Sequence, residues 1–215
     1  MLKVGILISG RGSNMQALIE AATGGRAPAE IALVLSNRPD AGGLAAAEAA
    51  GIATAVIRHG DFNSREAFDE ALHARLIEAG VELVCLAGFM RLLSAGFVNK
   101  WHNRLINIHP SLLPAFKGLD VHERAIEAGV RITGCTVHYV RAEMDTGPII
   151  AQAAVPILAD DTGDTLAARI LAQEHVIYPL ALRLIAEGRV RVVNERVLVN
   201  GTTADPGVLV SPAVD

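Results

Sequence analysis

The sequence is poor in cysteine, in aromatic side chains and in excess positive charge. It has two cysteines in 215 residues, Cys85 and Cys135, and both lie in apolar runs. Neither a disulfide framework nor a structural zinc site is therefore expected, and a reduced, cytoplasmic compartment is the simpler setting. The formal net charge of -4 argues against nucleic acid as the main partner. Aromatic residues make up 4% and hydrophobic residues 51%, a balance typical of an α/β fold with buried aliphatic strands.

Long hydrophobic runs and metal-binding motifs are also missing. The apolar start, residues 1–8, is too short to span a bilayer and is ended by Ser9-Gly10-Arg11. It lacks the order of a signal peptide, so we interpret it as a buried strand and expect no membrane partner. The seven histidines form no H-x-H or H-E-x-x-H pattern, which predicts no catalytic metal. The absence of a G-x-S-x-G motif argues against a serine hydrolase.

Strand-like and helix-like segments alternate through the first half of the chain. Strands are expected at residues 4–8, 31–35, 53–57 and 81–86, with helices at 14–22, 44–50 and 64–79. This rhythm predicts a parallel sheet covered on both faces. The second half predicts strands at 105–109, 133–140 and 149–157, a helix at 165–187 and a hairpin at 190–199. The tail, 201–215, is expected to be loosely ordered.

A glycine-containing loop, residues 9–14, follows the first strand and opens the first helix. Glycine lets the backbone turn tightly, and free amides at a helix start attract phosphate. Ser13 with Gln16 fits a capping box. The loop is neither a dinucleotide fingerprint nor a P-loop, so a lone phosphate is the expected ligand. An ordinary strand-to-helix turn explains the loop about equally well.

Asn107 and His109 alternate with Ile106 and Ile108 in an expected strand that Pro110 ends. Alternation places the two polar side chains on one face, at the carboxyl end of the strand where α/β sheets bind ligands. An amide and an imidazole there suit acyl transfer, because both can donate to a developing oxyanion. A structural histidine is the competing interpretation.

Four further features of the sequence suggest residues of a binding site. Asp145 lies in a turn-like segment and would favour a charged His109 if the two meet. Arg65 puts a cation in the first turn of a helix that Asn63 would cap, where the dipole disfavours it. Glu174 falls on an apolar helical stripe, so its carboxylate needs a ligand or a buried donor as partner. The apolar loop 89–93 could form one wall of a pocket for a flat ring. For each feature a purely structural explanation stays open.

Taken together, five motifs resemble the folate-dependent glycinamide ribonucleotide formyltransferases. In order they are residues 8–14, 86–91, 107–114, 145–148 and 173–175. The resemblance covers residues 1–191, and the segment from Asn107 to Ser111 is shared with the wider folate formyltransferase group. The resemblance implies a three-layer Rossmann-like fold, mostly parallel, with an antiparallel addition in the C-terminal half. It also implies one domain over residues 1–200, with a phosphate-binding half, 1–100, and a folate and catalytic half, 101–200.

The resemblance further implies direct transfer of formyl from 10-formyltetrahydrofolate, the co-substrate, to the amine of glycinamide ribonucleotide. The implied catalytic residues are Asn107, His109 and Asp145. The ribonucleotide would contact Gly12, Ser13, Asn14, Leu171, Ala172, Gln173 and Glu174. The formyl folate would contact Arg65, Met90, Arg91, Leu92, Leu93, Asn107, Arg141, Ala142, Glu143, Met144 and Asp145.

Other functions stay open at this point. A methionyl-tRNA formyltransferase would normally carry a further RNA-binding domain, and a formyltetrahydrofolate deformylase an extra N-terminal domain. A non-catalytic sugar-phosphate sensor would use the glycine loop without needing Asn107, His109 and Asp145 together. The sequence leaves the oligomeric state open, a homodimer included.

Overall fold

A seven-stranded sheet with the order β3-β2-β1-β4-β5-β6-β7 runs through the computed structural model, which describes residues 1–201 and 211. The first five strands run parallel: β1 (Leu2–Ile8), β2 (Ala29–Ser36), β3 (Thr54–Val56), β4 (Leu83–Leu86) and β5 (Leu105–His109). Antiparallel pairing then adds β6 (Ile132–Tyr139) and β7 (Ile149–Pro156). The expected parallel sheet with an antiparallel addition is confirmed.

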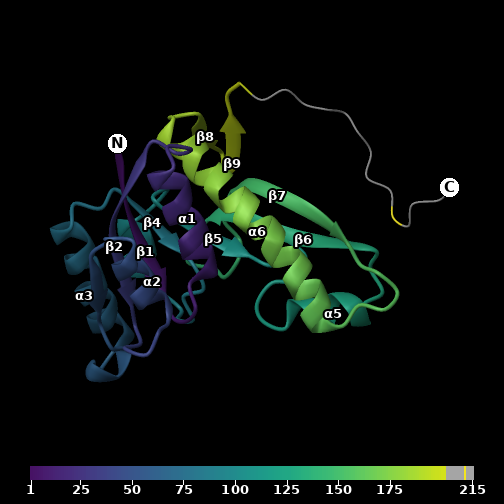
Figure 1. Ribbon diagram of the computed structural model, residues 1–215, viewed down its shortest axis with the longest axis horizontal. Coiled ribbons are helices and arrows are strands. Elements are labelled where there is room, and N and C mark those ends of the chain that lie inside the picture. The colour runs from purple at the N-terminus through teal and green to yellow at the C-terminus, as the bar shows by residue number, and fades with distance from the viewer. Residues whose placement is uncertain (202–210, 212–215) are drawn as a thin grey trace.

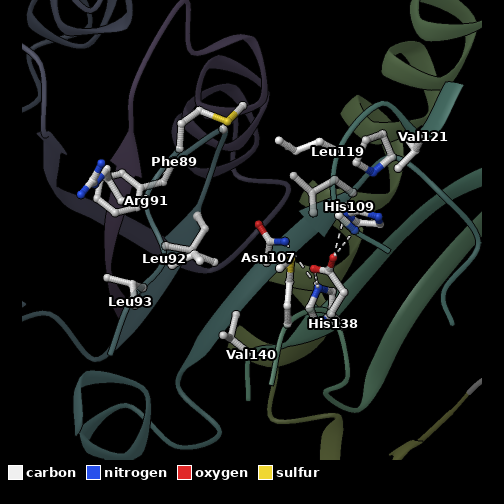
Figure 2. Close-up of a pocket in the computed structure, with 18 of the residues that line it drawn as sticks. Phe89, Arg91, Leu92, Leu93, Asn107, His109, Leu119, Val121, His138 and Val140 are labelled. Carbon is white, nitrogen blue, oxygen red and sulfur yellow. Dashed lines mark hydrogen bonds and ion pairs between the residues drawn. The ribbon is translucent and has the colours of Figure 1, made fainter. Parts of the chain in front are cut away.

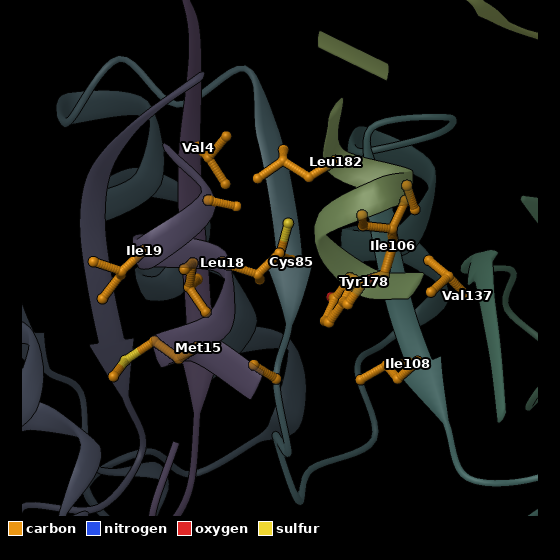
Figure 3. Close-up of a cluster of buried hydrophobic side chains, with 14 of the residues drawn as sticks. Val4, Met15, Leu18, Ile19, Cys85, Ile106, Ile108, Val137, Tyr178 and Leu182 are labelled. Atoms are coloured by element: carbon orange, nitrogen blue, oxygen red, sulfur yellow. The ribbon is translucent and has the colours of Figure 1, made fainter. Parts of the chain in front are cut away.

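Helices cover both faces of this sheet (Figure 1). One face carries α1 (Ser13–Thr23), α2 (Gly43–Ala49) and α6 (Gly163–Ala186), and the other carries α3 (Arg65–Glu78) and α4 (Ala95–Lys100). On the first face Met15, Leu18 and Tyr178 pack against strand residues such as Cys85 and Ile106 (Figure 3). The protein therefore has three layers and two apolar cores, as an α/β fold requires.

The predicted elements match the observed ones closely, with differences at short helices and caps. The strand at 105–109 is confirmed at both ends. Three short helices were not predicted, since three to seven residues show little periodicity: η1 (His59–Asp61), α4 and α5 (Val121–Glu127). Ser64, not Asn63, caps α3, because its hydroxyl accepts from the amide of Ala67 at 3.1 Å.

The C-terminal hairpin is confirmed as β8 (Val190–Val193) and β9 (Arg196–Val199). Asn194 and Glu195 form its turn with φ of 49° and 56°, as a two-residue hairpin turn requires. The expectation for the tail, 201–215, lies outside the described residues except at Gly201 and Ser211. Among the helices of the described part, none is both long and apolar enough to cross a membrane.

The sheet order reverses at β1, which has β2 on one side and β4 on the other. Chains that leave the carboxyl ends of such neighbouring strands diverge and open a crevice, where ligands of α/β proteins bind. The glycine loop leaves β1, the segment 87–93 leaves β4, and Pro110 follows β5. The fold thus brings three of the five sequence motifs to one edge.

Candidate functional site

A cavity of about 690 Å³ opens at the carboxyl ends of β4 and β5 (Figure 2). Every residue expected at the folate site except Glu143 lines it: Arg65, Met90, Arg91, Leu92, Leu93, Asn107, Arg141, Ala142, Met144 and Asp145. Glu143 is exposed, and its carboxylate lies 3.9 Å from the Lys117 ammonium. Residues from distant parts of the sequence therefore enclose one space large enough for a small-molecule ligand.

The alternation in β5 separates polar from apolar side chains as predicted. Ile106 and Ile108 are buried in the core beneath α6. Asn107 and His109 line the cavity from the opposite face (Figure 2). The two candidate catalytic groups therefore stand side by side, two residues apart on a buried strand.

His109 is buried, and both of its ring nitrogens face acceptor atoms. Nε2 lies 3.0 Å from the carbonyl oxygen of Phe116, and Nδ1 lies 3.6 Å from a carboxylate oxygen of Asp145. A carbonyl and a carboxylate only accept hydrogen bonds, so the ring can serve both only by carrying a proton on each nitrogen. The structure thus brings together His109 and Asp145, which the sequence alone could not place in contact.

Asp145 is held by backbone in a loop that runs from β6 to β7. Its φ is 54°, and its Oδ2 accepts from the amide of Gly118 at 3.0 Å. Two residues on, a Cβ at Gly147 would collide with the carbonyl oxygen of Tyr139. Gly147 therefore lets the loop pass directly over β6, and Asp145 lines the cavity.

His138 is a site residue that the sequence analysis missed. Its ring is 1% exposed, lies 3.4 Å from the Asn107 amide nitrogen and 3.9 Å from an Asp145 oxygen. Burial, the largest cause, lowers the pKa of His138, which keeps the ring neutral. The signal available in the sequence was the alternation of Thr136 and His138, two polar residues on one face of β6, as in β5.

His122 at the start of α5 is a second missed residue. It lines the cavity, and its buried Nε2 has no hydrogen-bond partner among the described residues. Burial lowers the pKa of His122. No sequence pattern had drawn attention to it, because the helix that carries it is seven residues long.

The walls of the cavity are apolar and exposed at the rim. Met90, Leu92, Leu119 and Met144 are between 49% and 75% exposed, as expected for a surface that a flat apolar ligand would cover. Ser9 holds the wall formed by loop 89–93, because the Ser9 hydroxyl accepts a hydrogen bond from the backbone amide of Met90 at 2.8 Å. Residues 89–93 therefore lie along one wall of the cavity, one of the two interpretations that the sequence left open.

Arg141 lines the cavity, but its guanidinium is turned toward the C-terminal hairpin. It donates to both carboxylate oxygens of Glu195, at 2.7 and 3.2 Å, and to Asn103 at 2.8 Å. By contrast, neither Arg65 nor Arg91 has an ion-pair partner within residues 1–201 and 211. Of the three arginines that line the cavity, Arg65 and Arg91 are therefore the ones whose guanidinium groups can bind an anionic ligand.

The glycine loop lies beside α6 and not on the lining of the main cavity. Gly12 adopts φ 74° and forms the N-cap of α1 without a side-chain hydrogen bond, so the expected capping box of Ser13 and Gln16 is wrong. The side-chain nitrogen of Asn14, Nδ2, donates to the Glu174 carboxylate at 2.6 Å. Asn14 is thus the buried partner that Glu174 requires. Burial raises the pKa of Glu174.

The segment from Leu171 to Gln173 precedes Glu174 on α6 and is partly exposed. The Oδ1 of Asn14 is buried and has no hydrogen-bond partner among the described residues. The contact of Asn14 with Glu174 thus joins the two segments that were expected to bind the ribonucleotide, residues 12–14 and 171–174, named here the loop–α6 cluster.

The two cysteines lie in the core as free thiols. Burial raises the pKa of Cys85 and of Cys135 to about 12, so neither is an accessible thiolate nucleophile. No group of three His, Cys, Asp or Glu residues suited to a metal ion occurs in the part of the chain that the structure describes.

Comparison with known proteins places this geometry in a family. The family model described as formyl transferase matches residues 2–182. The trifunctional purine biosynthetic protein adenosine-3 of Gallus gallus is 52% identical over 191 residues, 89% of this chain but 19% of that protein. The chain therefore spans about a fifth of the length of that relative.

Two further relatives match over nearly their whole length. The phosphoribosylglycinamide formyltransferase of Escherichia coli (strain K12) is 43% identical, over 95% of this chain and 97% of that protein. The crystal structure of glycinamide ribonucleotide transformylase 1 from Symbiobacterium toebii superposes with a TM-score of 0.91, at 51% identity, covering 93% and 94% of the two chains. The chain belongs to the formyl transferase family and, within it, to the group of the phosphoribosylglycinamide formyltransferases.

Proposed function

We propose that this protein transfers the formyl group of 10-formyltetrahydrofolate to the amine of glycinamide ribonucleotide. The observation that carries the proposal is the cluster of Asn107, His109 and Asp145, which line the same cavity. An amide donor, an imidazole and a carboxylate together suit a reaction that builds negative charge on a carbonyl oxygen and moves a proton. We further propose that the reaction needs no metal and takes place in the cytoplasm, where Cys85 and Cys135 would stay reduced.

The proposed reaction begins when the substrate amine attacks the formyl carbon and forms a tetrahedral intermediate. Its oxygen becomes negative, and Asn107 donates an amide hydrogen to it. His109 donates from Nε2, so the substrate oxygen replaces the carbonyl of Phe116 as acceptor. Asp145 holds His109 charged and helps water carry the proton of the attacking amine to the folate nitrogen. The carbon–nitrogen bond to folate then breaks, which leaves tetrahydrofolate and the formylated amine of the substrate.

Two regions would bind the two substrates. The folate ring would lie between residues 90–93 and 141–145, against apolar side chains such as Leu92 and Met144, while its acidic end meets Arg65 or Arg91. The ribose phosphate would rest on the free amides of Gly12, Ser13 and Asn14 at the start of α1. The ribose hydroxyls would bind the loop–α6 cluster, where the Asn14 Oδ1 has no hydrogen-bond partner within residues 1–201 and Glu174 is buried.

The test of this proposal is a formyl-transfer assay with purified protein, 10-formyltetrahydrofolate, and either glycinamide ribonucleotide or water as acceptor. Turnover that requires the ribonucleotide supports the transferase. Equal folate breakdown without the ribonucleotide would indicate a deformylase instead. Binding of the ribonucleotide with no turnover would favour a sugar-phosphate sensor.

Variants of the two donors test the assigned chemistry. Loss of one oxyanion donor costs roughly 10²–10³ in rate, so Asn107→Ala and His109→Ala should each lower the single-turnover rate by about that factor. Thermal melts of the variants provide the control for folding. Rates close to those of the unaltered protein, in variants that fold, would refute the roles of these residues.

A further inference from the structure

We infer that His138, in its neutral form, is a positioning residue for formyl transfer: its Nε2 accepts a hydrogen bond from the Asn107 amide and keeps the amide nitrogen of Asn107 turned toward the reacting group. This inference rests on the proposed function and extends it, because His138 lies outside the motifs from which that function was argued.

The sheet places the two side chains together. Asn107 in β5 and His138 in β6 are direct partners in the antiparallel register, and His109 pairs with Thr136 two residues away. Side chains of residues directly opposite each other in such a pair lie on the same face, in contact. His138 is therefore held beside Asn107 by backbone pairing, on the face that forms the floor of the cavity (Figure 2).

The hydrogen bonds of His138 identify its tautomer. Its Nδ1 lies 2.9 Å from the carbonyl oxygen of Tyr139, which can only accept, so Nδ1 carries the hydrogen. In a neutral imidazole the other nitrogen, Nε2, then presents a lone pair. The Asn107 Nδ2 stands 3.4 Å from that lone pair and is its donor.

The lone pair decides which way the Asn107 amide turns. A carboxamide has two orientations, related by a half-turn, that exchange its oxygen and its nitrogen. The reversed orientation would set the Asn107 oxygen against the Nε2 lone pair, and two acceptors repel each other. With Nδ2 on the His138 side, one amide hydrogen binds His138 and the second is available to an oxyanion in the cavity.

The surroundings of His138 keep its ring neutral. Three charged or titratable groups face it: Asp145 from the loop after β6, Arg141 from the same loop, and His109 from β5. Asp145 favours the protonated ring and the other two oppose it, while burial at 1% exposure outweighs them all. Protonation at low pH would make Nε2 a donor, which would attract the Asn107 oxygen and reverse the amide.

A double-mutant cycle in the full-length protein tests the coupling. His138→Leu removes the acceptor, and the loss of one hydrogen bond should lower kcat roughly 3- to 10-fold with a smaller change in the KM for formyl folate. In the Asn107→Ala background the same substitution should have almost no further effect, because the group it positions is gone. His138→Gln, whose side-chain oxygen can accept from Asn107, should restore part of the rate.

A readout that needs no activity accompanies the cycle. Long-range ¹H–¹⁵N NMR of histidine-labelled protein should show His138 with its hydrogen on Nδ1 and a bare Nε2 at neutral pH. A hydrogen on Nε2 would overturn the inference even if the enzyme is fully active. Losses for His138→Leu and Asn107→Ala that multiply independently would overturn it as well, since a merely structural role predicts that result.

The same experiments separate this inference from the proposed function. If the unaltered protein transfers no formyl group to the ribonucleotide, the proposed function fails, and with it the positioning role in that reaction. If transfer occurs and either the tautomer or the coupling is absent, the role of His138 alone fails.

Discussion

At the scale of single residues, the buried polar side chains are paired across great distances in the sequence. Asn14 and Glu174 are separated by 160 positions yet meet at 2.6 Å. A buried carboxylate without such a donor would cost several kcal/mol, so the contact explains how α6 tolerates Glu174 on its apolar stripe. Burial still disfavours the charged form of the carboxylate, and this raises the pKa of Glu174.

That raised pKa predicts a pH-dependent stability. The folded protein holds the Glu174 proton more tightly than the unfolded chain does, so stability falls as pH rises through the interval between the two pKa values. Glu174→Gln does not titrate and can still accept from Asn14. The melting temperature of Glu174→Gln, relative to that of the unaltered protein, should therefore increase as pH rises from about 4 to 8.

The exposed Glu127→Gln on α5 is the matched control and should show no such trend. Thermal melts of the three proteins across this pH range measure the effect. A Glu174→Gln difference that stays constant with pH would contradict the explanation by burial.

At the scale of elements, the loop between β6 and β7 is anchored at both ends and in the middle. Arg141 pairs with Glu195 at the hairpin turn, Asp145 accepts from the Gly118 amide, and Gly147 passes close to Tyr139. These contacts join three segments that are remote in the sequence. The hairpin of β8 and β9, which contributes nothing to the lining of the main cavity, therefore supports the loop that does.

Removal of the hairpin anchor should affect folate binding more than stability. Glu195→Ala removes the carboxylate that holds Arg141 and leaves Asn103 as its side-chain partner, so this end of the loop is held more weakly, and we expect a several-fold rise in the KM for formyl folate. The stability change should be at most about 1 kcal/mol, because the carboxylate of Glu195 is largely exposed. Glu78→Ala, which breaks a comparable exposed pair with Arg75 far from the cavity, should change neither quantity. Steady-state kinetics that give the same KM for all three proteins would rule out the anchoring role.

At the scale of the whole molecule, α6 joins the two halves of the chain. The Tyr178 hydroxyl lies 2.9 Å from the carbonyl of Leu86 in β4 and 3.3 Å from that of Ile106 in β5. These are the strands whose carboxyl ends carry the cavity. A helix from the C-terminal half thus ties together the parallel strands beneath the site.

Loss of this hydroxyl should therefore destabilise the whole fold. Tyr178→Phe keeps the ring but removes the buried donor, at a cost of about 1–2 kcal/mol, or roughly 2–8 °C in melting temperature. Tyr139→Phe is the control, since the hydroxyl of Tyr139 makes no hydrogen bond to the described residues. Equal melting temperatures for the two variants would show that the Tyr178 hydroxyl contributes little.

The sequence by itself determined the sheet, the order of its main helices and the face on which the chemistry lies. Local periodicity carries that information, because a period of two in residues 106–109 separates core from cavity wherever the strand packs. The glycine loop could likewise be predicted from the sequence, because glycine marks a tight backbone turn, which is set within a few residues. The family motifs added the expected site residues, and those of the folate wall do line one cavity, with Glu143 as the exception.

Only the tertiary structure decided which of these residues touch. The pairs Asn14–Glu174, His109–Asp145, Asn107–His138 and Arg141–Glu195 arise from strand register and helix packing between remote segments. The local sequence around each partner is the same whether or not they meet, so no pattern of neighbours could have predicted the contact. The alternation of Thr136 and His138 placed His138 on a polar face of its strand, but its significance comes from Asn107 on the strand opposite, and cross-strand pairing is a property of the folded sheet.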